Sequence, residues 1–198
     1  MSIFNLDSQN KNLDNKIVAG LERLSQVFRT LLWEKAKTHG LSPIQIQLLI
    51  FIQYHTANKT TISYLAKEFN LTKPTISDAI KSLNQKKLIE KCIDGNDSRS
   101  YTIQLTEKGK NVVNETEDFP APLTGIIAKT TASDKEVLWK NITNLIVQLN
   151  QLNIIDVQRT CLNCTHHTMV NNHDFCTLIN TQLETKDIRI DCPEFELK

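Results

Sequence analysis

Two short amphipathic segments with almost nothing between them constrain this fold more than any other feature of the sequence. Residues 61–69 and 72–88 each place apolar side chains at the spacing of one helical face. Only Asn70 and Leu71 separate the two segments, and so short a connection is typical of a helix-turn-helix. The sequence therefore predicts two packed helices, the second with a buried side formed by Ile76, Ile80 and Leu83.

A β-hairpin is predicted directly after the second segment, because the hydrophobic period changes there from 3.6 to 2. The stretches LIEKCID (88–94) and YTIQLT (101–106) alternate between apolar and polar side chains around the loop GNDSRS. Two helices followed by a hairpin are the arrangement of a winged helix-turn-helix, in which the hairpin is the wing.

Longer helices are predicted on both sides of this core, over residues 14–38, 43–54 and 133–152, with a further helix that starts at Thr106 and is interrupted around Pro120 and Pro122. Ser42, Pro43 and Gln45 supply an N-cap, a proline in the first turn and the second partner of a capping box. Ser133 and Glu136 predict another capping box at the start of the last helix. The fold class is therefore mainly α with a small β-hairpin wing.

The second helix of the predicted helix-turn-helix has the right size to enter the major groove of DNA. The side chains that project from its early turns are Lys73, Thr75, Ser77, Asp78 and Lys81. The hairpin tip adds Asn96, Ser98 and Arg99. One arginine on an extended wing suits the narrow, electronegative minor groove. Residues 56–110 hold ten Lys/Arg against six Asp/Glu, a net charge of +4, which favours an anionic partner.

Two stretches, TISYLAKEFNLTKPTISDAIKSLNQKKLIEK and DGNDSRSYTIQLTEKG, resemble the MarR family of bacterial transcription regulators. The second matches the family's wing signature through Asp94, Asp97, Arg99, Leu105, Thr106 and Gly109. The resemblance covers roughly residues 10–152. At one position the chain departs from it, because Lys87 replaces the usual glycine before Leu88-Ile89. If this position needs a positive φ, a lysine there costs about 1 kcal/mol.

The resemblance implies a transcription regulator rather than an enzyme. It implies a homodimer, joined by the first and last helices, that binds a pseudo-palindromic site in double-stranded DNA and acts as a repressor by occluding a promoter. Many such regulators respond to a small-molecule effector in a cleft beside the dimer helices. Aromatic and histidine side chains that such a cleft could use are Trp33, His39, Phe51, Tyr54 and His55. Because apolar aromatic residues on such helices are more often plain core than a ligand site, no ligand site is assigned.

A Cys-rich segment follows the winged-helix pattern, with the spacing Cys161-x2-Cys164-x11-Cys176-x15-Cys192. Four thiols are the soft ligand set of tetrahedral Zn²⁺. The segment holds few large apolar residues, and so small a unit needs a metal or another staple to fold. The sequence predicts a domain over residues 1–156 and a zinc-binding appendage over 157–198, with the four cysteines as ligands.

Several alternatives to this zinc site stay open. The same thiols could hold an iron–sulfur cluster, or His173 could replace one cysteine as a ligand. The metal could serve a metal- or redox-sensing regulator instead of a purely structural role. The chain could also be a zinc-stapled module whose winged helix binds protein. Catalytic thiol chemistry is disfavoured, because a thioredoxin-like setting for Cys161 and Cys164 is missing.

The remaining composition favours a cytoplasmic protein. The start MSIFNLDSQNKN has no signal-peptide pattern, and the most apolar stretch, IQIQLLIFIQY, is too short to span a bilayer. Five cysteines without an export signal are expected to be reduced thiols. We therefore expect no membrane partner.

Overall fold

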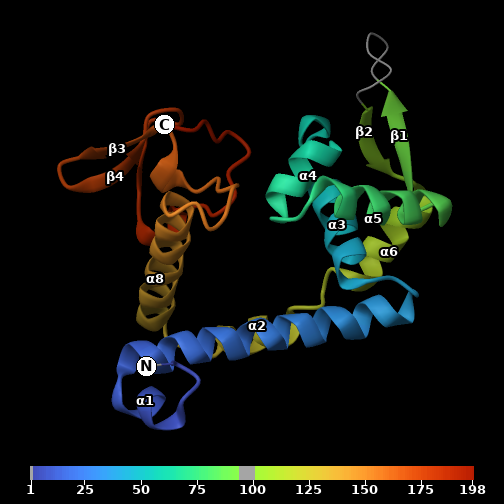
Figure 1. The fold of residues 1–198 in the computed structure, drawn as a ribbon. Helices are drawn as coiled ribbons and strands as arrows, with labels where there is room; N and C mark the ends of the chain where they lie inside the picture. The colour runs from blue at the N-terminus through green and yellow to red at the C-terminus, as the bar shows by residue number, and fades with distance from the viewer. Residues whose placement is uncertain (1, 94–100) are drawn as a thin grey trace. The chain divides into compact units, whose positions relative to one another are not determined.

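The computed structural model describes residues 2–93 and 101–198 and divides into two compact units (Figure 1). The first unit contains Met1–Leu65 and Lys73–Thr124, and the second contains Ala66–Thr72 and Gly125–Lys198. The second unit thus groups the last long helix with the Cys-rich segment. The domain boundary expected after residue 156 stays a prediction. Among the described residues, no helix is both long and apolar enough to cross a membrane.

The first part of the chain has the predicted order of helices and hairpin. Its elements are α1 (Leu6–Lys11), α2 (Leu13–Thr38), α3 (Pro43–Tyr54), the 3-10 turn η1 (Ala57–Lys59), α4 (Ile62–Glu68), α5 (Lys73–Gln85), β1 (Ile89–Ile93), β2 (Tyr101–Leu105) and α6 (Glu107–Thr116). The strands β1 and β2 pair antiparallel, with Ile89 opposite Leu105 and Ile93 opposite Tyr101. This arrangement confirms the predicted winged helix-turn-helix fold.

The remaining elements are α7 (Ala121–Ala128), α8 (Ala132–Gln151), η2 (Cys161–Asn163), β3 (His167–Val170), β4 (His173–Cys176), β5 (Thr181–Leu183) and η3 (Thr185–Asp187). The strands form an antiparallel sheet in the order β3-β4-β5. Asn171 and Asn172 both have positive φ, at 49° and 63°. Two such residues in a row are the signature of the tight type I′ turn that joins β3 to β4. The sequence did not predict this sheet.

Local capping explains where several helices begin. As predicted, α3 begins at Pro43, and the backbone N–H of Ser42 donates to Oε1 of Gln45 at 2.9 Å. The prediction for α8 was wrong by two residues, because Thr131 rather than Ser133 is its N-cap. Oγ1 of Thr131 accepts from the backbone N–H of Asp134 at 3.1 Å. The Thr-x-x-Asp pattern competes with Ser133 for the same role and starts the helix earlier.

The core of the first unit lies between α3, α5, α6 and the hairpin (Figure 1). Its fully buried side chains include Ile46, Leu48, Leu49, Ile76, Ile80, Leu83, Ile89, Ile103 and Val113. The buried Thr60 ties η1 to the hairpin, because its Oγ1 accepts from the backbone N–H of Ile103 at 3.2 Å. Burial of Ile76, Ile80 and Leu83 confirms the predicted inner side of α5.

α5 ends at Gln85, three residues earlier than predicted, and the junction to β1 follows it. Lys87 has a φ of 58°, so the residue that replaces the family's glycine does adopt the left-handed conformation. The carbonyl of Lys87 accepts from Oγ1 of Thr106 at 2.8 Å, and Thr106 also caps α6 by accepting from the N–H of Gly109 at 3.1 Å. The Leu-Thr-x-x-Gly part of the wing signature therefore joins α6 to the base of the wing.

Candidate nucleic-acid interface and four-cysteine site

α5 exposes the side on which the sequence places the DNA-contacting residues. All five of these side chains are exposed, namely Lys73, Thr75, Ser77, Asp78 and Lys81. The apolar side chains of the helix turn inward, because the two sets alternate at the helical period. The lysines can reach phosphates, and the short polar side chains can donate to or accept from base edges. Their contact with DNA stays a prediction.

The wing rises from the same unit as two paired strands. The Nζ of Lys91 on β1 lies 4.3 Å from the ring centre of Tyr101 on β2, a cation–π contact across the strands. The predicted wing contacts Asn96, Ser98 and Arg99, and the signature residues Asp94 and Asp97, lie outside the described residues.

A family model described as the MarR family matches residues 39–100, which include α3, the helix-turn-helix and β1. Over residues 39–100 the chain is similar to the MarR family. The match includes the five exposed residues of α5 and the predicted wing contacts. We call residues 39–100 the MarR segment below.

Several solved structures share the fold around the MarR segment. A DNA complex of MepR from Staphylococcus aureus is 24% identical, with a TM-score of 0.57 over 65% of this chain and 94% of that one. FabT from Streptococcus pneumoniae in complex with DNA is 24% identical, with a TM-score of 0.56 over 69% and 99%. A MarR transcriptional regulator from Methanosarcina mazei Go1 is 20% identical, with a TM-score of 0.57 over 70% and 98%. At these identities the likeness establishes the winged-helix fold.

The aromatic residues considered for an effector cleft divide into a core group and an exposed group. Phe51 is buried and stacks on His55, with ring centres 3.7 Å apart. Trp33 and Tyr54 are exposed, and the Tyr54 hydroxyl donates to Glu117. This hydrogen bond raises the pKa of Tyr54 above its ordinary value. Phe51 is therefore a core residue, and an effector site stays a prediction.

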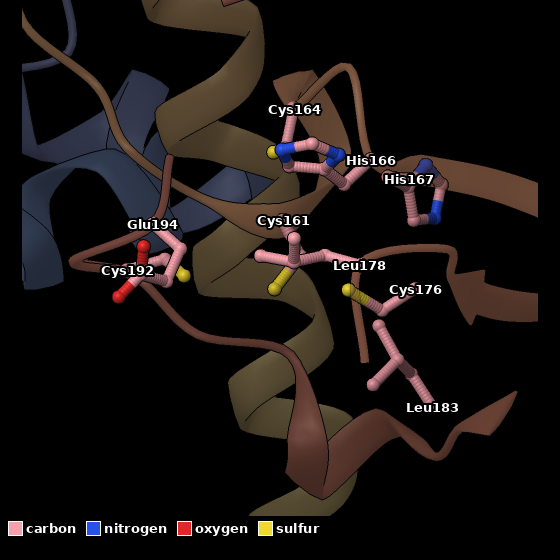
Figure 2. A pocket seen from close by; sticks show the side chains of 9 residues that line it. All are labelled: Cys161, Cys164, His166, His167, Cys176, Leu178, Leu183, Cys192 and Glu194. Carbon is pink, nitrogen blue, oxygen red and sulfur yellow. The ribbon is translucent and has the colours of Figure 1, made fainter. Parts of the chain in front are cut away.

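The four cysteines of the C-terminal segment line one small cavity of about 30 Å³ (Figure 2). Cys161 is the first residue of η2, and Cys164 directly follows that turn. Cys176 ends β4, and Cys192 lies in the loop near the C-terminus. The other lining residues are His166, His167, Leu178, Leu183 and Glu194. The fold thus brings together thiols that are up to 31 positions apart in the sequence.

Backbone hydrogen bonds hold the cysteine-bearing stretches of chain together. The N–H of Cys161 donates to the carbonyl of Arg189, and the N–H of Cys192 donates to the carbonyl of Arg159, each at 3.2 Å. The N–H of Arg189 donates to Sγ of Cys161 at 3.3 Å. Donors of this kind orient thiolate ligands in metal sites.

The environment of Cys161 opposes ionisation when no cation is present. Burial raises the pKa of its thiol, the hydrogen bond from Arg189 lowers it in part, and the nearby thiols of Cys192 and Cys176 raise it further. All five cysteines are free thiols. In the described part of the chain, no three His, Cys, Asp or Glu side chains already have the arrangement of metal ligands.

The histidines near the cavity have other partners. Nε2 of His167 lies 2.7 Å from Oδ1 of Asp174, and its Nδ1 lies 3.4 Å from Nζ of Lys198. Nε2 of His166 lies 3.6 Å from Oε2 of Glu196. The rival ligand His173 lines a separate polar pocket that does not include the cysteines. The geometry thus favours four thiols over a Cys3His set.

Sequence reasoning missed one polar cluster beside the cysteines. Arg159 is buried and binds the carboxylates of Glu68 and Asp191. Burial by itself lowers the pKa of Arg159, but the hydrogen bonds to Asp191 and Glu68 outweigh burial and raise that pKa above its ordinary value. The signal in the sequence was weak: Arg159 and Asp191 carry opposite charges and each lies shortly before a cysteine.

Proposed function

We propose that the protein is a sequence-specific DNA-binding transcription regulator that binds a pseudo-palindromic operator as a homodimer and represses by occluding a promoter. The observation that carries this proposal is the exposed polar side of α5 within a MarR segment. MepR and FabT, which share the fold, have been solved bound to DNA. The proposed role is DNA binding in the cytoplasm, and this role requires no catalytic group.

Unpartnered apolar surface on the two longest helices supports the homodimer. α2 exposes Ile17, Val18, Leu21, Leu24 and Phe28, and α8 exposes Val137, Leu138, Leu145 and Leu149. Each helix also has a polar side, so its apolar residues form a stripe. Apolar stripes of this extent on a single chain mark a protein–protein interface. A two-fold dimer places two α5 helices one turn of DNA apart, about 34 Å.

Selection from a pool of random duplexes tests DNA binding and identifies the operator in the same experiment. We expect enrichment of a sequence with two inverted half-sites about 10 base pairs apart, and a dimer mass in sedimentation. We also expect the logarithm of affinity to fall linearly with the logarithm of salt concentration. Failure to enrich any sequence, with a folded dimer in solution, would contradict the proposal and favour a protein-binding module.

We also propose that Cys161, Cys164, Cys176 and Cys192 hold one zinc ion. Three features support this ligand set: a shared cavity, a hydrogen-bond donor directed at one sulfur, and a segment with few buried apolar side chains, of which Leu183 and Ile188 are the large ones. So small a core needs a staple, and zinc bound to four thiolates supplies folding free energy directly.

Elemental analysis of freshly purified protein tests the metal. We expect about one zinc per chain and no visible absorption band. Cys164→Ser is expected to bring the zinc content near zero, because it removes the most buried of the four thiols. The matched control is Cys92→Ser, on β1 outside the cavity, which is expected to keep its zinc. A brown protein that contains iron would indicate an iron–sulfur cluster in place of zinc.

A further inference from the structure

The cluster of Arg159, Glu68 and Asp191 joins the cysteine site to the end of α4, within the second unit. Nη1 of Arg159 donates to Oε2 of Glu68 at 2.6 Å, and Nη2 donates to Oε1 at 3.1 Å. On its other edge, Nη2 donates to Oδ2 of Asp191 at 2.8 Å, and Nε donates to Oδ1. One guanidinium therefore binds two carboxylates, each through two hydrogen bonds, a geometry that lysine cannot reproduce.

Two members of the cluster, Arg159 and Glu68, are shielded from water. The side chains of Arg159 and Glu68 are only 8% and 18% exposed. At this burial, loss of Arg159 would leave the Glu68 carboxylate poorly hydrated and without its counterion, so this pair holds its two members in place more firmly than a surface ion pair. Asp191, whose side chain is 38% exposed, is a second counterion for Arg159.

One end of the cluster belongs to the cysteine site. Arg159 precedes Cys161 by two residues, and Asp191 directly precedes Cys192. The backbones of residues 159 and 191 form a β-bridge, and the N–H of Cys192 donates to the carbonyl of Arg159 at 3.2 Å. A metal bound to Cys161 and Cys192 would lock the two chain segments that present Arg159 and Asp191. Few buried apolar residues are present to do so without the metal.

The other end belongs to the helix-turn-helix. Glu68 is the last residue of α4, and α5 begins at Lys73. A second tie lies in the turn itself, where Nδ2 of Asn70 donates to the carbonyl of Ile154 at 2.9 Å and Asn70 adopts a φ of 53°. Both ties end on residues of α4 and of the turn that leads to α5.

We infer, resting on the DNA binding and zinc site proposed above, that the cysteine site regulates DNA affinity through Arg159. Metal binding orders residues 159–161 against 189–192, and Arg159 then holds Glu68 at the end of α4. Metal loss releases Arg159 and Asp191, frees the 66–72 stretch and weakens DNA binding. Arg159 is a positioning residue, and the zinc site is sensory as well as structural. The change in DNA affinity depends on how far metal binding shifts the 66–72 segment from its released state to its ordered state.

The first test uses the unmodified protein with and without zinc. Amide hydrogen exchange over residues 66–72 is measured without DNA, and affinity for the selected duplex is measured at fixed salt. Removal of zinc by a chelator is expected to speed exchange at 66–72 by about 10-fold or more and to lower DNA affinity by a similar factor. Equal exchange and equal affinity in zinc-loaded and zinc-free protein would overturn the inference.

A matched pair of variants then tests the route. Glu68→Gln keeps the shape of the side chain but removes its charge, and it is expected to bind zinc normally while its DNA affinity no longer responds to zinc. Glu34→Gln breaks an exposed ion pair with Lys37 and is expected to respond like the unmodified protein. A zinc response that persists undiminished in Glu68→Gln would overturn the route through Arg159. If Glu68→Gln folds poorly, the exchange measurement on the unmodified protein still decides.

The outcomes also separate this inference from the proposals beneath it. Absence of bound zinc refutes the zinc site, and the inference fails with it. Bound zinc with no change at residues 66–72 refutes the inference alone. A zinc-dependent change at 66–72 in a protein that selects no DNA refutes the DNA-binding function and leaves the link from the metal to the helix-turn-helix intact.

Discussion

Replacing Lys73 and Lys81 together by glutamate is expected to lower affinity for the selected DNA by about 100-fold or more at about 150 mM salt. Both side chains lie on the exposed side of α5. Each lost contact in a protein–DNA interface costs about 1–3 kcal/mol, and reversed charges add repulsion from the phosphates. The slope of log affinity against log salt is expected to become shallower by about two. Fluorescence anisotropy over a salt series measures both quantities.

A second double variant separates the role of α5 from net charge. Lys129→Glu with Lys140→Glu makes the same change in total charge at positions outside the MarR segment. We expect this control to lose less than about 5-fold in affinity, because screening weakens charges beyond about 8–10 Å. Equal losses in the two double variants would refute α5 as the recognition helix.

Gly109→Ala is expected to lower the free energy of unfolding by about 2–4 kcal/mol. A Cβ at this position would lie 2.0 Å from the carbonyl oxygen of Leu88 and 3.0 Å from its carbonyl carbon. Both are backbone atoms, so α6 or the base of the wing would have to move. Leu88 is buried, and its carbonyl also accepts from the N–H of Thr106. Urea unfolding followed by circular dichroism measures the loss.

Two further variants fix the interpretation of this result. Gly125→Ala, in α7, meets no atom within 4 Å and is expected to be neutral or to stabilise by up to about 1 kcal/mol. Lys87→Gly is expected to stabilise by about 0.5–1 kcal/mol, because it relieves a left-handed lysine at the same junction. A Gly109→Ala protein as stable as the original would show that α6 does not depend on close approach to Leu88.

Most of the first unit could be predicted from the sequence, because its signals are local. The helical period locates α2 to α5, the period of two locates the hairpin, and Ser42 with Gln45 fixes the start of α3. The conformation of Lys87 could be anticipated only through a resemblance, since a lysine carries no local preference for positive φ. The start of α8 was misplaced because Thr131 and Ser133 offer nearly equivalent caps two residues apart.

The candidate sites were predictable to different degrees. The exposed residues of α5 could be predicted from the helical period of its apolar residues, and the four cysteines could be predicted as ligands from their residue type. The sheet β3-β4-β5 carries too few apolar residues for alternation to be visible. The ion pair between Glu68 and Arg159 joins positions 91 apart in sequence. Only the folded chain brings these two charges together, because no periodic pattern encodes a contact of such range.

The buried pairing of Glu68 with Arg159 also affects how this chain can be dissected. A chain shortened to end before residue 157 would keep the whole MarR segment but leave the carboxylate at the end of α4 facing water instead of a guanidinium. Its melting temperature and DNA affinity would then describe a different electrostatic state of the first helix of the helix-turn-helix. The isolated winged helix is therefore not a neutral reference for the intact protein, and Glu68→Gln in the full-length chain is the better baseline.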